Sequence, residues 1–271
     1  MAPAAPQPAG RLLSVVLGNA STALGVVAPG ERGGEVVRHW TLSSDERRTA
    51  DEWAVLVRGL VGPHLDEVEG VAVAATVPWV LGRWREMLER HLPDLPVVVV
   101  GAGVRTGIPV LTDNPREVGA DRVVNALAAL TRWGGPAVVV DVGGTAVTLE
   151  VVNAAGQYVG GAIAPGVEVG LEGLGRRAAQ LRQVELVRPR SVVARNTVEA
   201  VQSGLVHGTA AMVEGLVRRA LAEQDLDPAT TRVVATGAYA GLVADEAGCF
   251  TDVEPHLTLL GLGLVFARNH R

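Results

Sequence analysis

The sequence predicts an α/β protein. Short Val- and Ala-rich runs are typical of strands buried on both faces of a sheet. Between them lie segments in which apolar residues recur every three or four positions, as in amphipathic helices. Alternation of these two kinds of segment along a chain is the pattern of an α/β fold.

The strand candidates are short apolar runs bounded by glycine, proline or polar residues. They are Leu12–Leu17, Ala23–Val27, Val71–Thr76, Pro96–Val100, Ala137–Val142, Thr148–Val152 and Arg232–Thr236. Helical spacing occurs at Trp53–Val61, Leu81–Leu92 and Val123–Leu130. A long helix is expected from about Thr197 to Leu221, with Asn196 or Thr197 as its N-cap, and a last helix after Pro255.

Two segments about half a chain apart resemble each other. Leu13–Val27 has the sequence LSVVLGNASTALGVV, and Val138–Val152 has VVVDVGGTAVTLEVV. Each combines a Val-rich strand, a glycine turn with small hydroxyl residues, and a second strand. Two interpretations stay open: duplicated domains that face each other across a cleft, or two ordinary β-hairpins, since Gly-Asn and Gly-Gly are common turn formers.

The composition excludes several classes of function. All 24 basic side chains are arginine, and 29 acidic residues bring the formal net charge to -5. Without lysine there is no P-loop lysine and no Schiff base, and the acidic balance argues against nucleic acid as a partner. No apolar run reaches the ~20 residues of a membrane span.

The cysteine count and the composition of residues 1–10 bear on the compartment in which the protein acts. Cys249 is the single cysteine, which excludes an internal disulfide and is typical of a reducing compartment, so we expect a cytoplasmic protein. Residues 1–10 are rich in proline and alanine and lack the basic and apolar regions of a signal peptide. We expect these residues to form a disordered N-terminal extension.

Two polar segments are candidates for chemistry. In the turn from Asp141 to Thr145, glycines allow backbone N–H groups to approach anionic oxygens, and the threonine adds a hydroxyl. Asp141 can hold a cation, or it can simply be satisfied by turn amides. At the start of an expected helix, Asp121 can act as a base and Arg122 can bind a carboxylate or phosphate; the alternative is an Asp that only stabilises the helix dipole.

At these residues the chain resembles the type III pantothenate kinases, members of the actin-like ATPase superfamily. The strongest segment is Asn114–Asn125, NPREVGADRVVN, which resembles the family's substrate motif. Further segments follow in the family's order: HWTLSSDERRTADEW at 39–53, GGAIAPG at 160–166, NTVEAVQSG at 196–204 and ATGAYAGL at 235–242.

The resemblance implies duplicated RNase H-like domains around a central cleft. We expect an N-terminal domain at residues 11–118 and a C-terminal domain at residues 119–271, with the helix 119–133 at the boundary. The implied ligands are ATP, a pantothenate-like substrate, a monovalent cation (K⁺ or NH₄⁺) and, with an active enzyme, Mg²⁺. The family's habit implies a homodimer.

The resemblance also assigns roles to individual residues. Asp121 matches the general base and Asp141 the monovalent-cation ligand. The matching substrate-binding positions are Gly119, Ala120, Arg122, Thr197 and Thr112, the last standing where the family has a tyrosine. The expected nucleotide-binding positions are Gly18, Asn19, Ser21 and Thr22 in the first hairpin, and Gly143, Gly144 and Thr145 in the second.

The first hairpin departs from the family's Asp-x-Gly-Asn-Thr pattern. Val16 stands in place of the aspartate and Ala20 in place of the threonine, and the second hairpin carries one glycine more than the family's Asp-Phe-Gly-Thr. Two hypotheses follow. The chain phosphorylates pantothenate, or a related small hydroxy acid, with ATP in the first step of coenzyme A synthesis. Alternatively it is a catalytically impaired paralogue that acts as a ligand sensor, a regulator or the partner of an active subunit.

Overall fold

Two five-stranded sheets with one shared topology organise the chain. The structure is a computed structural model that describes residues 10–177 and 184–270, so the expected N-terminal extension lies outside it apart from Gly10. Contacts divide the chain into two units. Unit 1 takes its described residues from 10–108, 113–132 and 256–270, and unit 2 from 109–112 and 133–255.

The sheet of unit 1 has the order β3-β2-β1-β4-β5. Its strands are β1 (Arg11–Leu17), β2 (Ser21–Ala28), β3 (Glu35–Ser43), β4 (Val68–Ala75) and β5 (Val97–Val99). The first three form an antiparallel meander, while β4 lies parallel to β1 and β5 parallel to β4.

The sheet of unit 2 repeats this pattern strand for strand, in the order β8-β7-β6-β9-β10. Its strands are β6 (Ala137–Val142), β7 (Ala146–Val152), β8 (Tyr158–Pro165), β9 (Arg232–Thr236) and β10 (Asp252–Val253). Again three antiparallel strands are followed by two parallel ones. Of the two interpretations of the similar segments, duplicated domains is therefore the one that the structure confirms.

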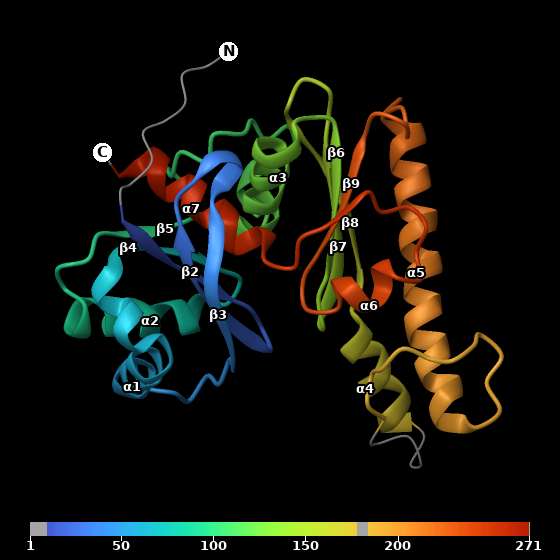
Figure 1. The fold of residues 1–271 in the computed structure, drawn as a ribbon, viewed down its shortest axis with the longest axis horizontal. Helices are drawn as coiled ribbons and strands as arrows, with labels where there is room; N and C mark the ends of the chain where they lie inside the picture. The colour runs from blue at the N-terminus through green and yellow to red at the C-terminus, as the bar shows by residue number, and fades with distance from the viewer. Residues whose placement is uncertain (1–9, 178–183, 271) are drawn as a thin grey trace. The chain divides into compact units, whose positions relative to one another are not determined.

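Seven α-helices accompany the sheets in the described part of the chain (Figure 1). They are α1 (Ala50–Val61), α2 (Pro78–His91), α3 (Ala120–Trp133), α4 (Val167–Arg177), α5 (Thr197–Glu223), α6 (Ala240–Ala244) and α7 (Leu257–Asn269). No helix among the described residues is both long and apolar enough to span a membrane.

The core of unit 1 is built on one face of its sheet by α1 and α2, which lie side by side (Figure 1). Trp53 and Trp84 have no exposed surface, and their ring centroids are 5.3 Å apart. Helix α1 begins with a capping box in which Thr49 and Glu52 bond each other's backbone N–H groups. Burial of two whole indoles contributes a large part of the stabilisation of this unit.

Helix α7 packs on the opposite face of the same sheet and against α3. Leu259 of α7 forms an apolar cluster with Val27, and Thr258 donates a hydrogen bond of 2.7 Å to Asn125 of α3. The contacts thus group residues 113–132 and 256–270 with unit 1. This division differs from the boundary expected between residues 118 and 119, because packing between distant segments does not follow chain order.

The approach of α7 to α3 depends on Gly261. A Cβ atom there would lie 2.5 Å from the carbonyl oxygen of Val124 and 3.2 Å from the Cβ of Ala128. We expect Gly261→Ala to lower the free energy of unfolding by about 1–3 kcal/mol, since overpacking against backbone cannot relax by a side-chain rotation. Urea titration would measure this change.

A matched control lies one half-turn further along the same helix. A Cβ atom at Gly263 would meet Val27 at 3.6 Å, an ordinary contact. Gly263→Ala is therefore expected to raise stability by about 0.5–1 kcal/mol through backbone entropy alone. Equal effects of the two substitutions would contradict this account of the packing.

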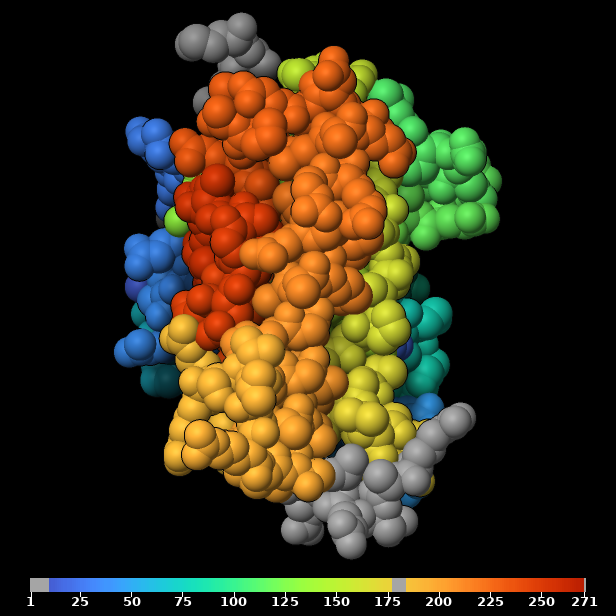
Figure 2. Space-filling view, turned by 90° about the vertical axis from the view of Figure 1, so that its right-hand side faces the viewer, coloured from blue at the N-terminus to red at the C-terminus, as the bar shows by residue number. Residues whose placement is uncertain are grey.

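The core of unit 2 lies between its sheet and the long helix α5, which runs across the face shown in Figure 2. Val213, Val217 and Leu221 of α5 pack with alternate residues of β6 and β7. The side chain of Asn196 accepts a hydrogen bond of 2.9 Å from the backbone N–H of Glu199, so Asn196, one of the two expected candidates, is the N-cap.

Candidate functional site

The second hairpin, residues 143–145, joins β6 to β7. Gly143 donates its N–H to the carbonyl oxygen of Ala146 at 3.0 Å, and a Cβ atom on Gly143 would lie 2.9 Å from that oxygen. Within the described residues the N–H groups of Gly144 and Thr145 have no hydrogen-bond partner, and Thr145 is exposed. The turn therefore offers two backbone donors and a hydroxyl to an anionic oxygen.

The beginning of α4 supports this hairpin from one side. Gly166 donates its N–H to the carbonyl oxygen of Thr145 at 3.0 Å, and Glu168 donates to that of Gly144 at 3.1 Å. A Cβ atom on Gly144 would collide with the carboxylate of Glu168. A side chain at position 144 would therefore have to displace the carboxylate of Glu168.

The loop after β9 supports the hairpin from the other side. The N–H of Tyr239 bonds the carbonyl oxygen of Val142 at 3.0 Å. Gly237 has a φ of +94°, and a Cβ atom there would collide with Oδ1 of Asp141. Both constraints require glycine, so the backbone of this loop can cross close to the carboxylate that ends β6.

A side-chain hydrogen bond joins the two supporting segments. The hydroxyl of Tyr239 donates to Oε1 of Glu168 at 2.5 Å. Burial, together with this hydrogen bond and the negative charge of Glu168, raises the pKa of Tyr239 to about 12. Neither residue was expected from the sequence to take part in the site, although both stand in or beside segments that resemble the family's motifs.

The raised pKa of Tyr239 has a consequence for stability. Because the folded state disfavours the phenolate, this group's contribution is complete below its ordinary pKa of 10 and is lost as the pH rises through about 12. We therefore expect wild-type protein to lose stability between pH 10 and 12 more steeply than Tyr239→Phe. Urea titrations of the two proteins at pH 8, 10 and 11.5 would measure the difference; parallel curves would contradict it.

The first hairpin has the same construction. Residues 18–20 join β1 to β2, and Gly18 donates its N–H to the carbonyl oxygen of Ser21 at 3.0 Å. This turn has the same length as the turn of residues 143–145, so the sequences of the two hairpins align residue by residue without a gap.

The supports of the first hairpin are duplicated as well. Ser44 donates its N–H to the carbonyl oxygen of Ala20 at 2.9 Å, and Thr76 donates to that of Leu17 at 3.0 Å. These bonds correspond to those that the start of α4 and the loop after β9 make in unit 2. The equivalence of the two hairpins therefore rests on hydrogen bonds as well as on sequence.

This equivalence shows what the first hairpin lacks. Val16 occupies the position of Asp141, and Ala20 the position of Thr145. Val16 is half-buried and packs with the apolar cluster that includes Leu259 of α7. Unit 2 thus keeps the carboxylate and the hydroxyl that unit 1 has exchanged for apolar side chains.

The other candidates in the first hairpin differ in exposure. Asn19 and Ser21 are exposed, and the N–H of Asn19 has no hydrogen-bond partner within the described residues. Thr22 is fully buried, and its hydroxyl lies 2.8 Å from that of Ser44. The structure therefore uses Thr22 to hold the hairpin rather than to present a donor to solvent.

The expected substrate residues of unit 1 begin α3. Oδ1 of Asp121 accepts a hydrogen bond of 3.0 Å from the backbone N–H of Arg122. A Cβ atom on Gly119 would lie 2.5 Å from that oxygen, so glycine makes room for the carboxylate. Ala120, Asp121 and Arg122 are half-buried, which leaves part of each side chain accessible.

Two further candidates belong to unit 2. Thr197 is the first residue of α5 and is exposed. The hydroxyl of Thr112 is buried and has no hydrogen-bond partner within the described part of the chain. An orphaned buried hydroxyl is costly, and a polar group of a ligand would satisfy it.

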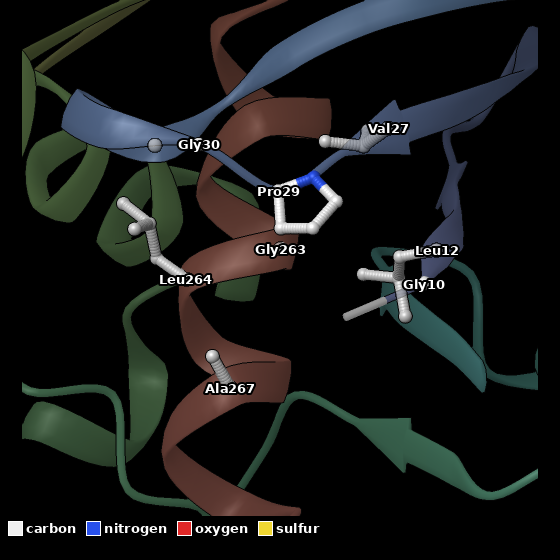
Figure 3. A pocket seen from close by; sticks show the side chains of 9 residues that line it. Gly10, Leu12, Val27, Pro29, Gly30, Gly263, Leu264 and Ala267 are labelled. Carbon is white, nitrogen blue, oxygen red and sulfur yellow. The ribbon is translucent and has the colours of Figure 1, made fainter. Parts of the chain in front are cut away.

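Two cavities, one in each unit, lie away from these residues. An apolar pocket of about 30 Å³ in unit 1 is lined by Gly10, Leu12 and Gly263 among others (Figure 3), at the end of β1 opposite to the first hairpin. This volume holds about one water molecule. A cavity of about 280 Å³ in unit 2 is lined by Leu149 and Val151, which face α5, whereas Asp141 and Thr148 point to the other face of the sheet.

Duplicated sheets, each with a glycine turn after its first strand, form the fold of actin-like ATPases and sugar kinases. Solved structures share this fold along the whole chain. The activator of 2-hydroxyisocaproyl-CoA dehydratase from Clostridium difficile, with bound ADPNP, matches with a TM-score of 0.55 and 13% identity over 95% of this chain and 94% of that one. A ROK family glucokinase from Streptomyces griseus, in complex with glucose and AMPPNP, matches with a TM-score of 0.53 and 12% identity over 94% and 99%.

Within this class, the chain belongs to the type III pantothenate kinase family, whose model matches residues 12–219. A type III pantothenate kinase of a Nocardioides species is 59% identical over 95% of this chain and 99% of its own length. That of Streptomyces griseus is 51% identical over 95% and 98%. The fold and the family expected from the sequence are both confirmed.

Proposed function

We propose that this chain transfers the γ-phosphoryl group of ATP to the primary hydroxyl of pantothenate, which yields 4'-phosphopantothenate and ADP in the first step of coenzyme A synthesis. The observation that carries the proposal is similarity at 59% identity to a type III pantothenate kinase over nearly the whole chain. The second hairpin, with its available backbone donors and Thr145, adds a physical reason to expect a phosphate ligand.

The proposed roles follow from what each group can do. Asp121 takes the proton of the substrate hydroxyl while that oxygen bonds to the γ-phosphorus and the bond to ADP breaks. Arg122 binds the carboxylate of pantothenate, for which a guanidinium is suited. Thr112 and Thr197 contribute hydroxyls on the substrate side, and Gly119 leaves room for the base.

Nucleotide binding is assigned to the hairpins. The backbone of residues 143–145 binds phosphate oxygens, and Gly18 and Asn19 contribute from the first hairpin. Mg²⁺ carried by ATP needs only one or two protein carboxylates because phosphates and water complete its shell. This fits the described residues, in which no three His, Cys, Asp or Glu side chains converge. Asp141 would hold a monovalent cation, which supplies positive charge beside the phosphates.

Further assignments complete the proposal. The protein would act in the cytoplasm as a homodimer on a small, soluble substrate. Size-exclusion chromatography with light scattering would test the dimer.

The decisive test is ADP release by the purified protein, coupled to a spectrophotometric readout, with ATP, Mg²⁺ and pantothenate. Pantothenate-dependent turnover supports the proposal. Repeating the assay in a buffer without K⁺ tests the role of the monovalent cation. Turnover no faster than that of Asp121→Asn would overturn the kinase function.

A second candidate function is favoured by Val16 and Ala20. A chain whose first hairpin has lost a carboxylate and a hydroxyl could keep the substrate pocket while acting as a ligand sensor, a regulator or the partner of an active paralogue. Separate calorimetric titrations with pantothenate and with Mg·ATP distinguish the candidates. Pantothenate binding without ATP binding supports the second, and tight ATP binding supports the kinase.

A further inference from the structure

Glu168 and Tyr239 form a bridge across the outside of the second hairpin. The bridge begins at Gly144, whose carbonyl accepts the N–H of Glu168 at 3.1 Å, and ends at Val142, whose carbonyl accepts the N–H of Tyr239 at 3.0 Å. The hydrogen bond of 2.5 Å between the two side chains closes it. Each residue is therefore attached to the hairpin through its backbone and to the other through its side chain.

The bridge places a negative charge at the hairpin. One carboxylate oxygen of Glu168 is occupied by the Tyr239 hydroxyl, and the other is the atom nearest to a Cβ atom built on Gly144. The unpartnered N–H of Gly144 belongs to the same residue. A phosphate that approaches this donor is consequently repelled by the carboxylate, unless a cation accompanies the phosphate.

The first hairpin has no such bridge. The residue that corresponds to Tyr239 is Thr76, and its hydroxyl bonds the carbonyl oxygen of Leu17 at 3.1 Å. The two hairpins thus share two of their supporting backbone bonds, but no described residue donates its N–H to the carbonyl oxygen of Asn19 as Glu168 does to that of Gly144. Glu46, which follows Ser44 by two positions as Glu168 follows Gly166, is exposed and makes no bond to the first hairpin.

We propose that the Glu168–Tyr239 pair positions the second hairpin for the nucleotide phosphates, and that the Glu168 carboxylate makes this hairpin accept a triphosphate only together with its cation. Glu168 and Tyr239 are positioning residues here; neither is assigned a contact with the reacting atoms. The inference rests on the proposed function, because it takes the ligand of the hairpin to be a nucleotide.

The test measures binding of AMPPNP by calorimetry, with Mg²⁺ and with EDTA, to wild type, Glu168→Gln and Tyr239→Phe. Glutamine keeps the size of the side chain and an oxygen that can accept the tyrosine hydrogen bond but removes the charge. We expect the preference of wild type for Mg·AMPPNP over metal-free AMPPNP to fall about tenfold in Glu168→Gln. In steady-state kinetics, Tyr239→Phe should raise the KM for ATP about three- to tenfold and leave the KM for pantothenate unchanged.

A matched control lies one turn further along α4. Glu172 is exposed and pairs with Arg176 at 3.1 Å, so Glu172→Gln removes the same charge away from the hairpin and should change neither quantity. Because the chain has only two tyrosines, ultraviolet titration can follow Tyr239 directly. Its pKa should move from about 12 toward its ordinary value in Glu168→Gln.

The outcomes separate this inference from the kinase function. An unchanged Mg²⁺ preference in Glu168→Gln, or a KM for pantothenate that moves together with the KM for ATP, overturns the inference while wild-type turnover stands. A wild type that shows the Mg²⁺ preference, sensitive to Glu168→Gln, but does not phosphorylate pantothenate keeps the inference and overturns the kinase function. Failure of wild type to bind AMPPNP under either condition overturns both.

Discussion

Asp121→Asn is expected to lower the kcat for pantothenate phosphorylation by ~10²–10⁴-fold, the usual contribution of a general base. An asparagine amide keeps the size of the side chain, and its oxygen can still accept the N–H of Arg122, which bonds Asp121 at 3.0 Å. It cannot take a proton from the substrate hydroxyl. The KM for pantothenate and the stability should therefore change little, and steady-state kinetics with the coupled assay would measure both constants.

Asp94→Asn is the control for this substitution. Asp94 is an exposed residue between α2 and β5, so the same chemical change there should leave kcat unaltered. A kcat for Asp121→Asn within threefold of wild type would show that Asp121 is not the base. Loss of activity in both variants would indicate a general effect of the lost charge.

Asp141→Val is expected to lower turnover by ~10²–10³-fold, the loss that follows removal of one preorganised charge-stabilising group. The substitution places in unit 2 the residue that unit 1 carries at the equivalent position, Val16. It changes neither the hairpin backbone nor Gly237, whose backbone passes close to the side chain at position 141. Turnover should also lose its dependence on K⁺, and assays in K⁺ and in Na⁺ buffers would measure both effects.

The reciprocal substitution, Val16→Asp, tests the same equivalence from the other side. We expect turnover to rise by up to ~10²-fold, which is the contribution of one such charge. Stability should fall by about 1–3 kcal/mol, because the new carboxylate would replace an apolar contact with Leu259 and Leu260 of α7. If Asp141→Val lost no activity and Val16→Asp gained none, neither hairpin would act on the phosphates.

Local sequence was sufficient for the elements whose burial repeats with a regular period. Helix α1 buries Trp53 and Val57, as the helical spacing predicted, and α2 buries Trp84 and Leu88. Strands β1 and β6 agree with the predicted Val-rich runs to within one residue. Each of these elements is covered by other parts of its unit, so its apolar pattern is continuous and strong.

Elements at the margins of the sheets were missed because their patterns are weak. Strand β3 has mostly exposed or half-buried residues, and β8, at the edge of its sheet, contains Gly160 and Gly161. Helix α4 is likewise largely exposed. A segment that buries little apolar surface shows little periodicity, and its structure is decided by the strand or helix beside it.

The candidate site residues stay predictions, and the sequence proposed them from local segments. The residues taken from motif resemblance, such as Asp121 and Asp141, stand in short segments whose order alone identified them. Glu168 and Tyr239 were not predicted, because they are 71 positions apart and meet only through the bonds that each makes to the hairpin.

By itself, the sequence determined the α/β class, the duplication, the family and the apolar exchange at Val16, since all of these depend on residue types in local order. Only the tertiary structure decided which segments support each hairpin, that α3 and α7 pack together through Gly261, and that a carboxylate lies against Gly144. The physical reason is that these contacts join residues far apart in the chain. Their geometry depends on strand pairing and packing, which no single segment encodes.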